Sequence, residues 1–237
     1  MATFSFKQFT IHQDQTAMKV GTDGVLLGAW APIEHNPNSI LDIGAGTGLI
    51  ALMLAQRSNA EQIDALEIDE AAYEQAVDNF ENSPWSDRLF CFHAGLDEFM
   101  EEPEDEYDLI VSNPPFYTED YTSGNEQRDA ARFSAAMPFE DLVEAAALLL
   151  SENGIFATII PHKEEQNFIA LANQSELYPV KITRVKGTPT TEIKRSLLAF
   201  SRNQTTTPAT DELLIETSRH AYTEEYIALT REFYLKM

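Results

Sequence analysis

Cysteine, long apolar runs and basic residues are all scarce in this sequence. Cys91 is the single cysteine among the 237 residues, so an internal disulfide and a cysteine metal cage are both excluded, and a reducing compartment is the natural setting. No stretch reaches the roughly 18 uncharged apolar residues that a membrane span requires. The opening MATFSFKQF lacks the apolar core of a signal peptide. We therefore expect a soluble, cytoplasmic protein with no membrane partner.

The shortage of basic residues is uneven along the chain. Sixteen Lys and Arg face 39 Asp and Glu, and the resulting net charge of −23 argues against a broad phosphate-binding surface. Residues 59–108 contain 17 acidic side chains and one basic residue, Arg88. Residues 181–202 contain six basic residues and the single acid Glu192. Both stretches can be solvated faces, but the basic one is equally a candidate for contact with nucleic acid.

Short apolar runs alternate with helical patterns along most of the chain. We predict seven strands, at residues 39–43, 62–68, 89–93, 107–111, 154–160, 178–186 and 196–201. We predict helices at residues 25–30, 49–55, 70–80, 139–150, 164–173 and 224–234. This alternation indicates an α/β fold, a doubly wound, mostly parallel, seven-stranded sheet of the Rossmann-like type in three layers. We expect a single domain over residues 1–237, with an N-terminal segment at 1–38, a core at 39–202 and a last strand and helix in 203–237.

A glycine-rich turn follows the first predicted strand. The stretch DIGAGTG places Gly44, Gly46 and Gly48 at alternate positions, which lets a ligand approach the backbone closely. It matches neither the dinucleotide pattern nor a triphosphate loop. Glu67, at the end of the second strand, is placed to accept hydrogen bonds from ribose hydroxyls, and Asp42 is suited to an ammonium group. An adenosine ligand without phosphates, S-adenosylmethionine, fits this set; a turn that only packs helix on strand, or a dinucleotide site, is the alternative.

The adenine of such a ligand needs a partner after the third strand. The chain there reads Phe92-His-Ala-Gly-Leu-Asp97. Asp97 is the nearest candidate for contact with the adenine amino group. It is equally a candidate cap for the helix that follows, because aspartate is a common N-cap residue.

The fourth predicted strand ends abruptly in SNPPF. The side-chain carbonyl of Asn113 and the backbone carbonyl of Pro114 can accept both hydrogens of an exocyclic amine and stabilise the positive charge that grows there during methyl transfer. Pro115 keeps the turn rigid and free of N–H donors, and Phe116 offers a ring on which a planar base can stack. Asn113 also lies beside the predicted cofactor. We predict that Asn113, Pro114, Pro115 and Phe116 form a catalytic clamp that needs no metal. Taken alone, the NPP sequence is also typical of a simple turn.

This clamp looks like the (D/N)PP(Y/F/W) motif of amino-directed class I methyltransferases, which modify adenine N6, guanine N2, cytosine N4 or glutamine amides. Further segments closely resemble the bacterial tRNA1(Val) (adenine-37-N6)-methyltransferase family, namely FKQF at 6–9, MKVGTDGVLLGAW at 18–30, RDAAR at 128–132 and YTEEYIALTREFY at 222–234. The resemblance runs through nearly the whole chain in order. It implies methylation of the adenine next to the anticodon of one valine tRNA, with S-adenosylmethionine as the cofactor.

The same resemblance implies two further details of the cofactor site. Thr22 and Asp23 belong to a segment that closes over the cofactor, although from the residues alone they can be just a cap and turn before a helix. Ala94-Gly95 departs from the Ala-Asp pair expected after the third strand. This departure leaves the adenine amino group to Asp97 or to a backbone group.

Basic residues near these motifs are candidates for binding tRNA. Arg128 and Arg132 are four apart, so both can face the phosphates that flank a flipped base, unless they pair with neighbouring acids. Lys7 and Lys19 lie in a segment that also contains Phe4, Phe6 and Phe9, although each can be an ordinary surface lysine. The predicted tRNA contacts are Lys7, Lys19, Arg128, Arg132, Lys194 and Arg195.

We therefore predict an S-adenosylmethionine-dependent tRNA (adenine-N6)-methyltransferase with no obligate protein partner. One rival is N6-adenine or N2-guanine methylation of ribosomal RNA or DNA. Another is methylation of a glutamine amide in a protein, which usually goes with Tyr after the prolines and with a helical N-terminal domain. A binding module with an inactive pocket is the non-enzymatic rival, and the intact NPPF, Asp42 and Glu67 argue against it.

Overall fold

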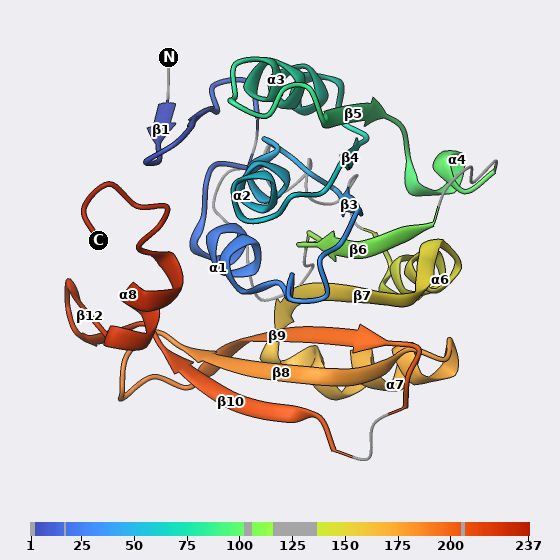
Figure 1. The fold of residues 1–237 in the computed structure, drawn as a ribbon. Coiled ribbons are helices and arrows are strands. Elements are labelled where there is room, and N and C mark those ends of the chain that lie inside the picture. The colour runs from blue at the N-terminus through green and yellow to red at the C-terminus, as the bar shows by residue number, and fades with distance from the viewer. Residues whose placement is uncertain (1–2, 17, 102–105, 116–136, 205–206) are drawn as a thin grey trace, which may run out of the picture.

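One large sheet organises the molecule. The computed structural model describes residues 3–16, 18–101, 106–115, 137–204 and 207–237. The sheet has eight strands in the order β10-β8-β9-β7-β6-β3-β4-β5, and Figure 1 shows them from β5 at the top to β10 at the bottom. Their bounds are β3 Ser39–Ile43, β4 Gln62–Glu67, β5 Leu89–His93, β6 Tyr107–Ser112, β7 Leu150–Pro161, β8 Tyr178–Lys186, β9 Ile193–Ser201 and β10 Ala209–Leu214.

All neighbouring strands from β5 to β7 run parallel, and β9 is antiparallel to both β7 and β8. This arrangement confirms the doubly wound, mostly parallel α/β fold. The strand count differs by one because β10 pairs in parallel with β8 at the edge of the sheet. Its sequence ATDELL buries only Leu213. An edge strand with one buried side chain lacks the apolar run from which the other strands were predicted.

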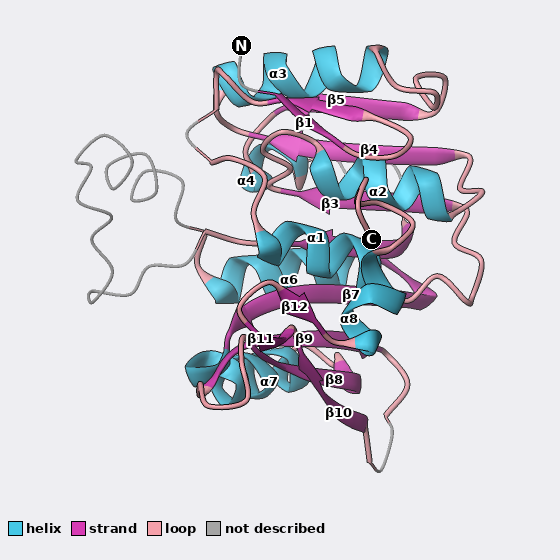
Figure 2. Cartoon of the chain, turned by 90° about the vertical axis from the view of Figure 1, so that its left-hand side faces the viewer, coloured by secondary structure: helices cyan, strands magenta, loops and turns pink. Residues whose placement is uncertain are grey.

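Helices cover both faces of the sheet (Figures 1 and 2). The helices are α1 Thr22–Trp30, α2 Leu49–Arg57, α3 Glu70–Glu81, α4 Leu96–Phe99, α6 Phe139–Leu149, the 3₁₀ turn η1 His162–Glu164, α7 Glu165–Gln174 and α8 Glu224–Thr230. Alternate residues of each strand face opposite layers. Ile40 and Leu109 pack in the cluster with α1, α2 and α8, whereas Leu41 and Ile110 pack in the one with α6 and α7. No helix within the described residues is long and apolar enough to cross a membrane.

The two ends of the chain pack against each other. The hairpin of β1 Thr3–Ser5 and β2 Thr10–His12 leads into a segment that contacts α3, where the N–H of Gln15 donates to the side chain of Gln75 at 2.9 Å. The short pair β11 Glu216–Ser218 and β12 Ala221–Tyr222 precedes α8. Phe6 is 4% exposed and Phe9 6% exposed, and both belong to the cluster that contains Phe233. The rings of Phe6 and Phe9 are therefore part of the core and are not presented to a nucleic acid.

Asn79 of α3 ties the N-terminal segment to the glycine-rich turn. Its side chain is buried, accepts the N–H of His12 at 2.8 Å, and donates to the carbonyl oxygens of His12 at 3.0 Å and Thr47 at 2.9 Å. A buried asparagine with three backbone partners fixes both segments at once.

Replacing Asn79 with alanine should lower the free energy of unfolding by about 3 kcal/mol, because three backbone groups lose their partner in a buried place. Urea unfolding measures this change. The matched control is Asn82→Ala, since exposed Asn82 donates only to the carbonyl of Asp78, and its effect should stay within about 0.5 kcal/mol. Equal midpoints for the two variants would contradict the role of Asn79.

Candidate active site

The carboxyl ends of three neighbouring strands form the centre of the site. The last residue of β3 pairs with Leu66 of β4 and with Ser112 of β6. Glu67 and Asn113 therefore come next on either side of Gly44. Strands in a sheet lie about 4.8 Å apart, which puts the two flanking backbones roughly 10 Å from each other. The sheet thus brings together the glycine turn, the predicted ribose-binding acid and the NPP sequence.

The glycine turn is open on the side where a ligand would approach. Gly44, Gly46 and Gly48 have φ angles of 75°, 57° and 75°. Residues with a Cβ rarely adopt such positive φ angles. A Cβ added at Gly44 or Gly46 would meet no atom within 4 Å, whereas one at Gly48 would lie 2.4 Å from the ring of Phe80. The first two glycines leave space, and Gly48 permits close packing of α2 against α3.

Asp42 lies beneath this turn and is fully buried. Its Oδ2 accepts the N–H of Ala51 in the first turn of α2 at 3.1 Å, and within the described structure its Oδ1 has no hydrogen-bond partner. Burial raises the pKa of this carboxyl to about 7; the N–H of Ala51 opposes the effect and the charge of Glu67 adds to it. The orphaned oxygen is a place where a cationic ligand group would be stabilised.

Glu67 holds the turn from the other side. Oε2 accepts the N–H of Gly46 at 2.7 Å and Oε1 accepts that of Asp69 at 2.9 Å. Burial raises the pKa of this carboxyl, although the N–H groups of Asp69 and Gly46 lower it. Each carboxylate oxygen has a second lone pair that can accept a ligand hydroxyl.

An exposed apolar residue follows Glu67 directly. Ile68 is 58% exposed, and its Cδ1 would lie 3.5 Å from a Cβ placed on Gly95. The Oδ1 of Asp97, in the first turn of α4, would be 2.6 Å from the same Cβ. Asp97 therefore folds back into the space that a side chain at position 95 would fill. Ile68 was predicted as the last residue of the second strand; β4 ends at Glu67 instead, which leaves Ile68 exposed beside the site.

The NPP sequence begins where β6 ends. Asn113 and Pro115 are partly exposed and Pro114 is buried. Ser112, missed from the sequence, is fully buried and donates its hydroxyl to the carbonyl of Ile43 at 2.9 Å. This bond fixes the start of the clamp against the strand that leads into the glycine turn. Phe116 lies outside the described residues.

Asp23, from the segment predicted to close over the cofactor, lies beside Arg195, a predicted tRNA contact. Gly21 is the N-cap of α1, and Thr22 is the first residue of the helix rather than its cap. Asp23 follows in the first turn and accepts a hydrogen bond from Nε of Arg195 at 2.8 Å. This ion pair connects α1 with the start of β9.

Several basic residues of the predicted tRNA surface have partners within the protein. The ammonium of Lys7 donates to the carbonyls of Arg231 and Met237. In residues 181–202, Lys181 lies over the ring of Trp30 at 4.7 Å, and the other engaged residues are Arg184, which pairs with Glu165, Arg195, which pairs with Asp23, and Arg202, which donates to carbonyls.

The basic residues of 181–202 therefore largely stabilise the fold. The number of basic residues in the sequence overstates the positive charge that this stretch exposes to solvent. Lys194 and Lys19 are exposed. Arg128 and Arg132 lie outside the described residues. The contacts of this set with tRNA stay a prediction.

The comparison with protein families matches the chain to the methyltransferase small domain over residues 24–172. A protein of Flavobacterium psychrophilum is 77% identical over 234 residues, covering 99% of this chain and all of that protein. One of Christiangramia forsetii is 61% identical over 236 residues, covering 99% and 98%. Both relatives are named tRNA1(Val) (adenine(37)-N6)-methyltransferase.

Among solved structures, a predicted O-methyltransferase from Agrobacterium tumefaciens superimposes with a TM-score of 0.69 at 20% identity. The match covers 89% of this chain and 96% of that one. At this identity the likeness concerns the fold alone, and it supports the Rossmann-like arrangement of the sheet.

Proposed function

Because the chain belongs to the family of tRNA1(Val) (adenine(37)-N6)-methyltransferases, we propose that it transfers a methyl group from S-adenosylmethionine to N6 of adenine 37 in tRNA1(Val). The observation that carries this proposal is the meeting of the open glycine turn, Glu67 and Asn113 at the ends of β3, β4 and β6. A tRNA substrate supports a cytoplasmic location.

The residues present fit S-adenosylmethionine, which supplies a methyl group on a positively charged sulfur. The space at Gly44 and Gly46 admits the ligand against the backbone. Glu67 has lone pairs for the ribose hydroxyls, and the unpaired Oδ1 of Asp42 would be stabilised by the ammonium end. Ile68 offers an apolar face for the adenine ring.

Asp97 supplies the acceptor for the cofactor's adenine amino group in this account. Gly95 leaves room for the Asp97 carboxylate in its present position, because a side chain at position 95 would displace it. The missing aspartate at position 95 is thus replaced by one two residues later, which reaches the same space beside Ile68. Thr22 and Asp23, at the start of α1, form the segment that closes over the cofactor.

On the substrate side, the protein's work is to orient an amine. The lone pair of adenine N6 is delocalised into the ring, so the amine is a weak nucleophile. Acceptance of its two hydrogens by the Asn113 side chain and the Pro114 carbonyl favours a pyramidal nitrogen and stabilises the charge that develops on it. Pro114 and Pro115 keep these acceptors rigid, and Phe116 provides the stacking ring.

Methylation of a tRNA1(Val) transcript with isotopically labelled S-adenosylmethionine tests the function. We expect label in N6-methyladenosine after nuclease digestion, and none in a transcript with guanosine at position 37. Ribosomal RNA, plasmid DNA and total protein serve as competing acceptors in parallel reactions. Preferential labelling of any of these three would overturn the proposal.

The pH dependence of cofactor binding tests Asp42. Since its pKa is raised to about 7, the carboxyl is largely protonated at lower pH, and stabilising a cation there requires release of that proton. Affinity for S-adenosylmethionine should therefore strengthen as pH rises and level off above about 7, with at most a tenfold change per pH unit. Titration calorimetry from about pH 5.5 to 8 measures this. Asp42→Asn should remove the bend near pH 7, and an unchanged curve would contradict the role of Asp42.

A further inference from the structure

An open surface cavity of about 490 Å³ lies at the turn between β8 and β9, away from the glycine turn. It is lined by His162, Lys186 and the turn residues Pro189, Thr190, Thr191, Glu192 and Ile193. The volume lies in the range that holds a small ligand or a single nucleotide. The turn is held in shape by Thr191, whose hydroxyl donates to the carbonyl of Thr188 at 2.9 Å and accepts its N–H at 3.0 Å.

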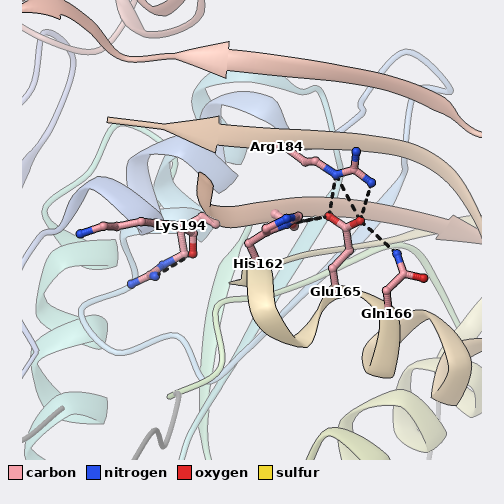
Figure 3. Close-up of polar contacts among 7 residues, drawn as sticks. His162, Glu165, Gln166, Arg184 and Lys194 are labelled. Atoms are coloured by element: carbon pink, nitrogen blue, oxygen red, sulfur yellow. Dashed lines mark hydrogen bonds and ion pairs between the residues drawn. The ribbon is translucent and has the colours of Figure 1, made fainter. Parts of the chain in front are cut away.

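His162 is oriented in this cavity by a buried carboxylate. Glu165 is 1% exposed and is bound by Arg184 at 2.7 Å and by the hydroxyl of Ser196 at 2.6 Å (Figure 3). Burial raises the pKa of this carboxyl, but hydrogen bonds from Arg184 and Ser196 outweigh it and bring the pKa to about 2. The group is therefore a carboxylate at neutral pH.

The hydrogen bonds fix which nitrogen of His162 is used internally. Nδ1 lies 2.9 Å from the hydroxyl oxygen of Ser196 and 3.1 Å from Oε2 of Glu165. Both groups accept there, because the Ser196 hydroxyl donates to Glu165, so Nδ1 carries a proton. Nε2 is directed away from this carboxylate by the geometry of the ring, and no hydrogen bond within the described structure engages it. The side chain is 34% exposed.

The chemistry around the cavity suits a ribose-phosphate unit. Lys186 provides a positive charge, and within the described part of the chain its ammonium has no ion-pair partner. Lys194, at the start of β9, is exposed nearby and in Figure 3 extends away from the Glu165 group. The Thr190 hydroxyl and the Glu192 carboxylate add groups that can accept from a ribose hydroxyl, the feature that distinguishes RNA from DNA.

The cavity lies at the same edge of the sheet as the clamp. β7 is parallel to β6 and ends just before His162. Lys186, the last residue of β8, pairs with Ile193, the first residue of the antiparallel strand β9, at the same edge. The order β6-β7-β9-β8 places the cavity two to three strand spacings from Asn113, or roughly 10–15 Å across the sheet. Because Ser112 pairs with Thr158, His162 also lies three residues farther along the strand direction than Asn113, which adds roughly 10 Å. A short single-stranded segment whose adenine lies at Asn113 spans that distance.

We propose that this cavity binds a ribonucleotide of the anticodon loop a few positions from the methylated adenine, with Lys186 on its phosphate and Nε2 of His162 accepting a hydrogen bond from its ribose hydroxyl. The inference rests on the proposed tRNA methylation and adds to it a second contact along the same edge. The cavity supplies binding energy and register to the tRNA. It takes no part in the chemistry of transfer.

Two substitutions test it through tRNA affinity. In His162→Asn the amide nitrogen can take the place of Nδ1 and keep the bond to Ser196, but nothing replaces Nε2. In His162→Gln the amide oxygen can take the place of Nε2 as an acceptor. We expect His162→Asn and Lys186→Ala each to weaken tRNA1(Val) binding about tenfold, raising KM while kcat at saturating tRNA and S-adenosylmethionine affinity stay unchanged. His162→Gln should retain most of the binding.

The matched control is Lys236→Ala, which removes an exposed lysine near the end of the chain and should change tRNA affinity less than twofold. Wild-type methylation of adenine 37 combined with unchanged tRNA affinity in His162→Asn and Lys186→Ala would overturn this inference alone. Failure of the wild-type protein to methylate the transcript would overturn the proposed function together with it. A fall in kcat with unchanged KM would also contradict a role in binding.

Discussion

Asn113→Ala should reduce the rate of methyl transfer to tRNA1(Val) by about 10²–10³-fold, the usual effect of removing one preorganised polar partner from a transition state. The loss arises because one hydrogen of the adenine amine loses its acceptor, so its nitrogen is held less well in the pyramidal geometry. Affinity for S-adenosylmethionine should change by no more than about threefold, since Glu67 and the glycine turn lie on other strands. Single-turnover methylation and calorimetric titration measure the two effects separately.

The matched control for this variant is Asn113→Asp, which keeps an acceptor oxygen at the same place and matches the other residue allowed by the motif. It should retain far more activity than Asn113→Ala. If the alanine variant instead lost cofactor binding and transfer together, Asn113 would be a structural residue of the strand end. Full activity in the alanine variant would remove the clamp from the mechanism.

Glu67→Gln should weaken S-adenosylmethionine binding by roughly 10–100-fold. Both carboxylate oxygens accept backbone N–H groups, from Gly46 and from Asp69. An amide presents an NH2 group to one of these donors and offers fewer lone pairs to the ribose hydroxyls, and hydrogen bonds to a charged acceptor contribute about 1.5–3 kcal/mol each. Equilibrium titration with S-adenosylmethionine gives the affinity, and kcat at saturating cofactor should fall much less.

Glu70→Gln provides the control for the charge change. Glu70 is exposed at the start of α3, three residues from Glu67, and its amide variant should bind the cofactor like the wild type. Thermal unfolding of both variants without cofactor separates loss of ligand contacts from loosening of the turn. Wild-type affinity in Glu67→Gln would show that the ribose is held elsewhere.

The sequence was most informative where a backbone feature dictates the residue. Strand ends followed by glycine or proline leave few alternatives, so the turn at Gly44 and the NPP at Asn113 were located without coordinates. The register that sets Glu67 and Asn113 on either side of Gly44 follows from parallel pairing of β3 with β4 and β6. The position of a side chain at the end of a strand can thus be predicted from the sequence pattern.

Roles that depend on a distant partner were not readable in this way. Arg195 was predicted as a tRNA contact, and the structure pairs it with Asp23, which is 172 positions away in the chain. Arg184 pairs with buried Glu165, and Lys7 holds the C-terminal segment. A charged residue in a sequence carries no sign of whether an opposite charge or a carbonyl faces it, so counting basic residues overestimated the free positive surface.

The adenine contact illustrates an intermediate case. Asp97 was a candidate from its proximity to the third strand, but only the geometry relates it to Gly95 and Ile68. The carboxylate occupies the volume that a side chain at position 95 would need. Glycine at position 95 and the position of the Asp97 carboxylate are therefore linked, and contact of Asp97 with the adenine stays a prediction.

In the proposed mechanism, two oxygen atoms at the end of β6 hold the amine that receives the methyl group. The most direct measurement is a crystal structure of the protein with S-adenosylhomocysteine and an anticodon stem-loop of tRNA1(Val). The account predicts N6 of adenine 37 about 3 Å from both Oδ1 of Asn113 and the carbonyl oxygen of Pro114. An adenine bound in the site with N6 beyond hydrogen-bonding distance of both oxygens would contradict it.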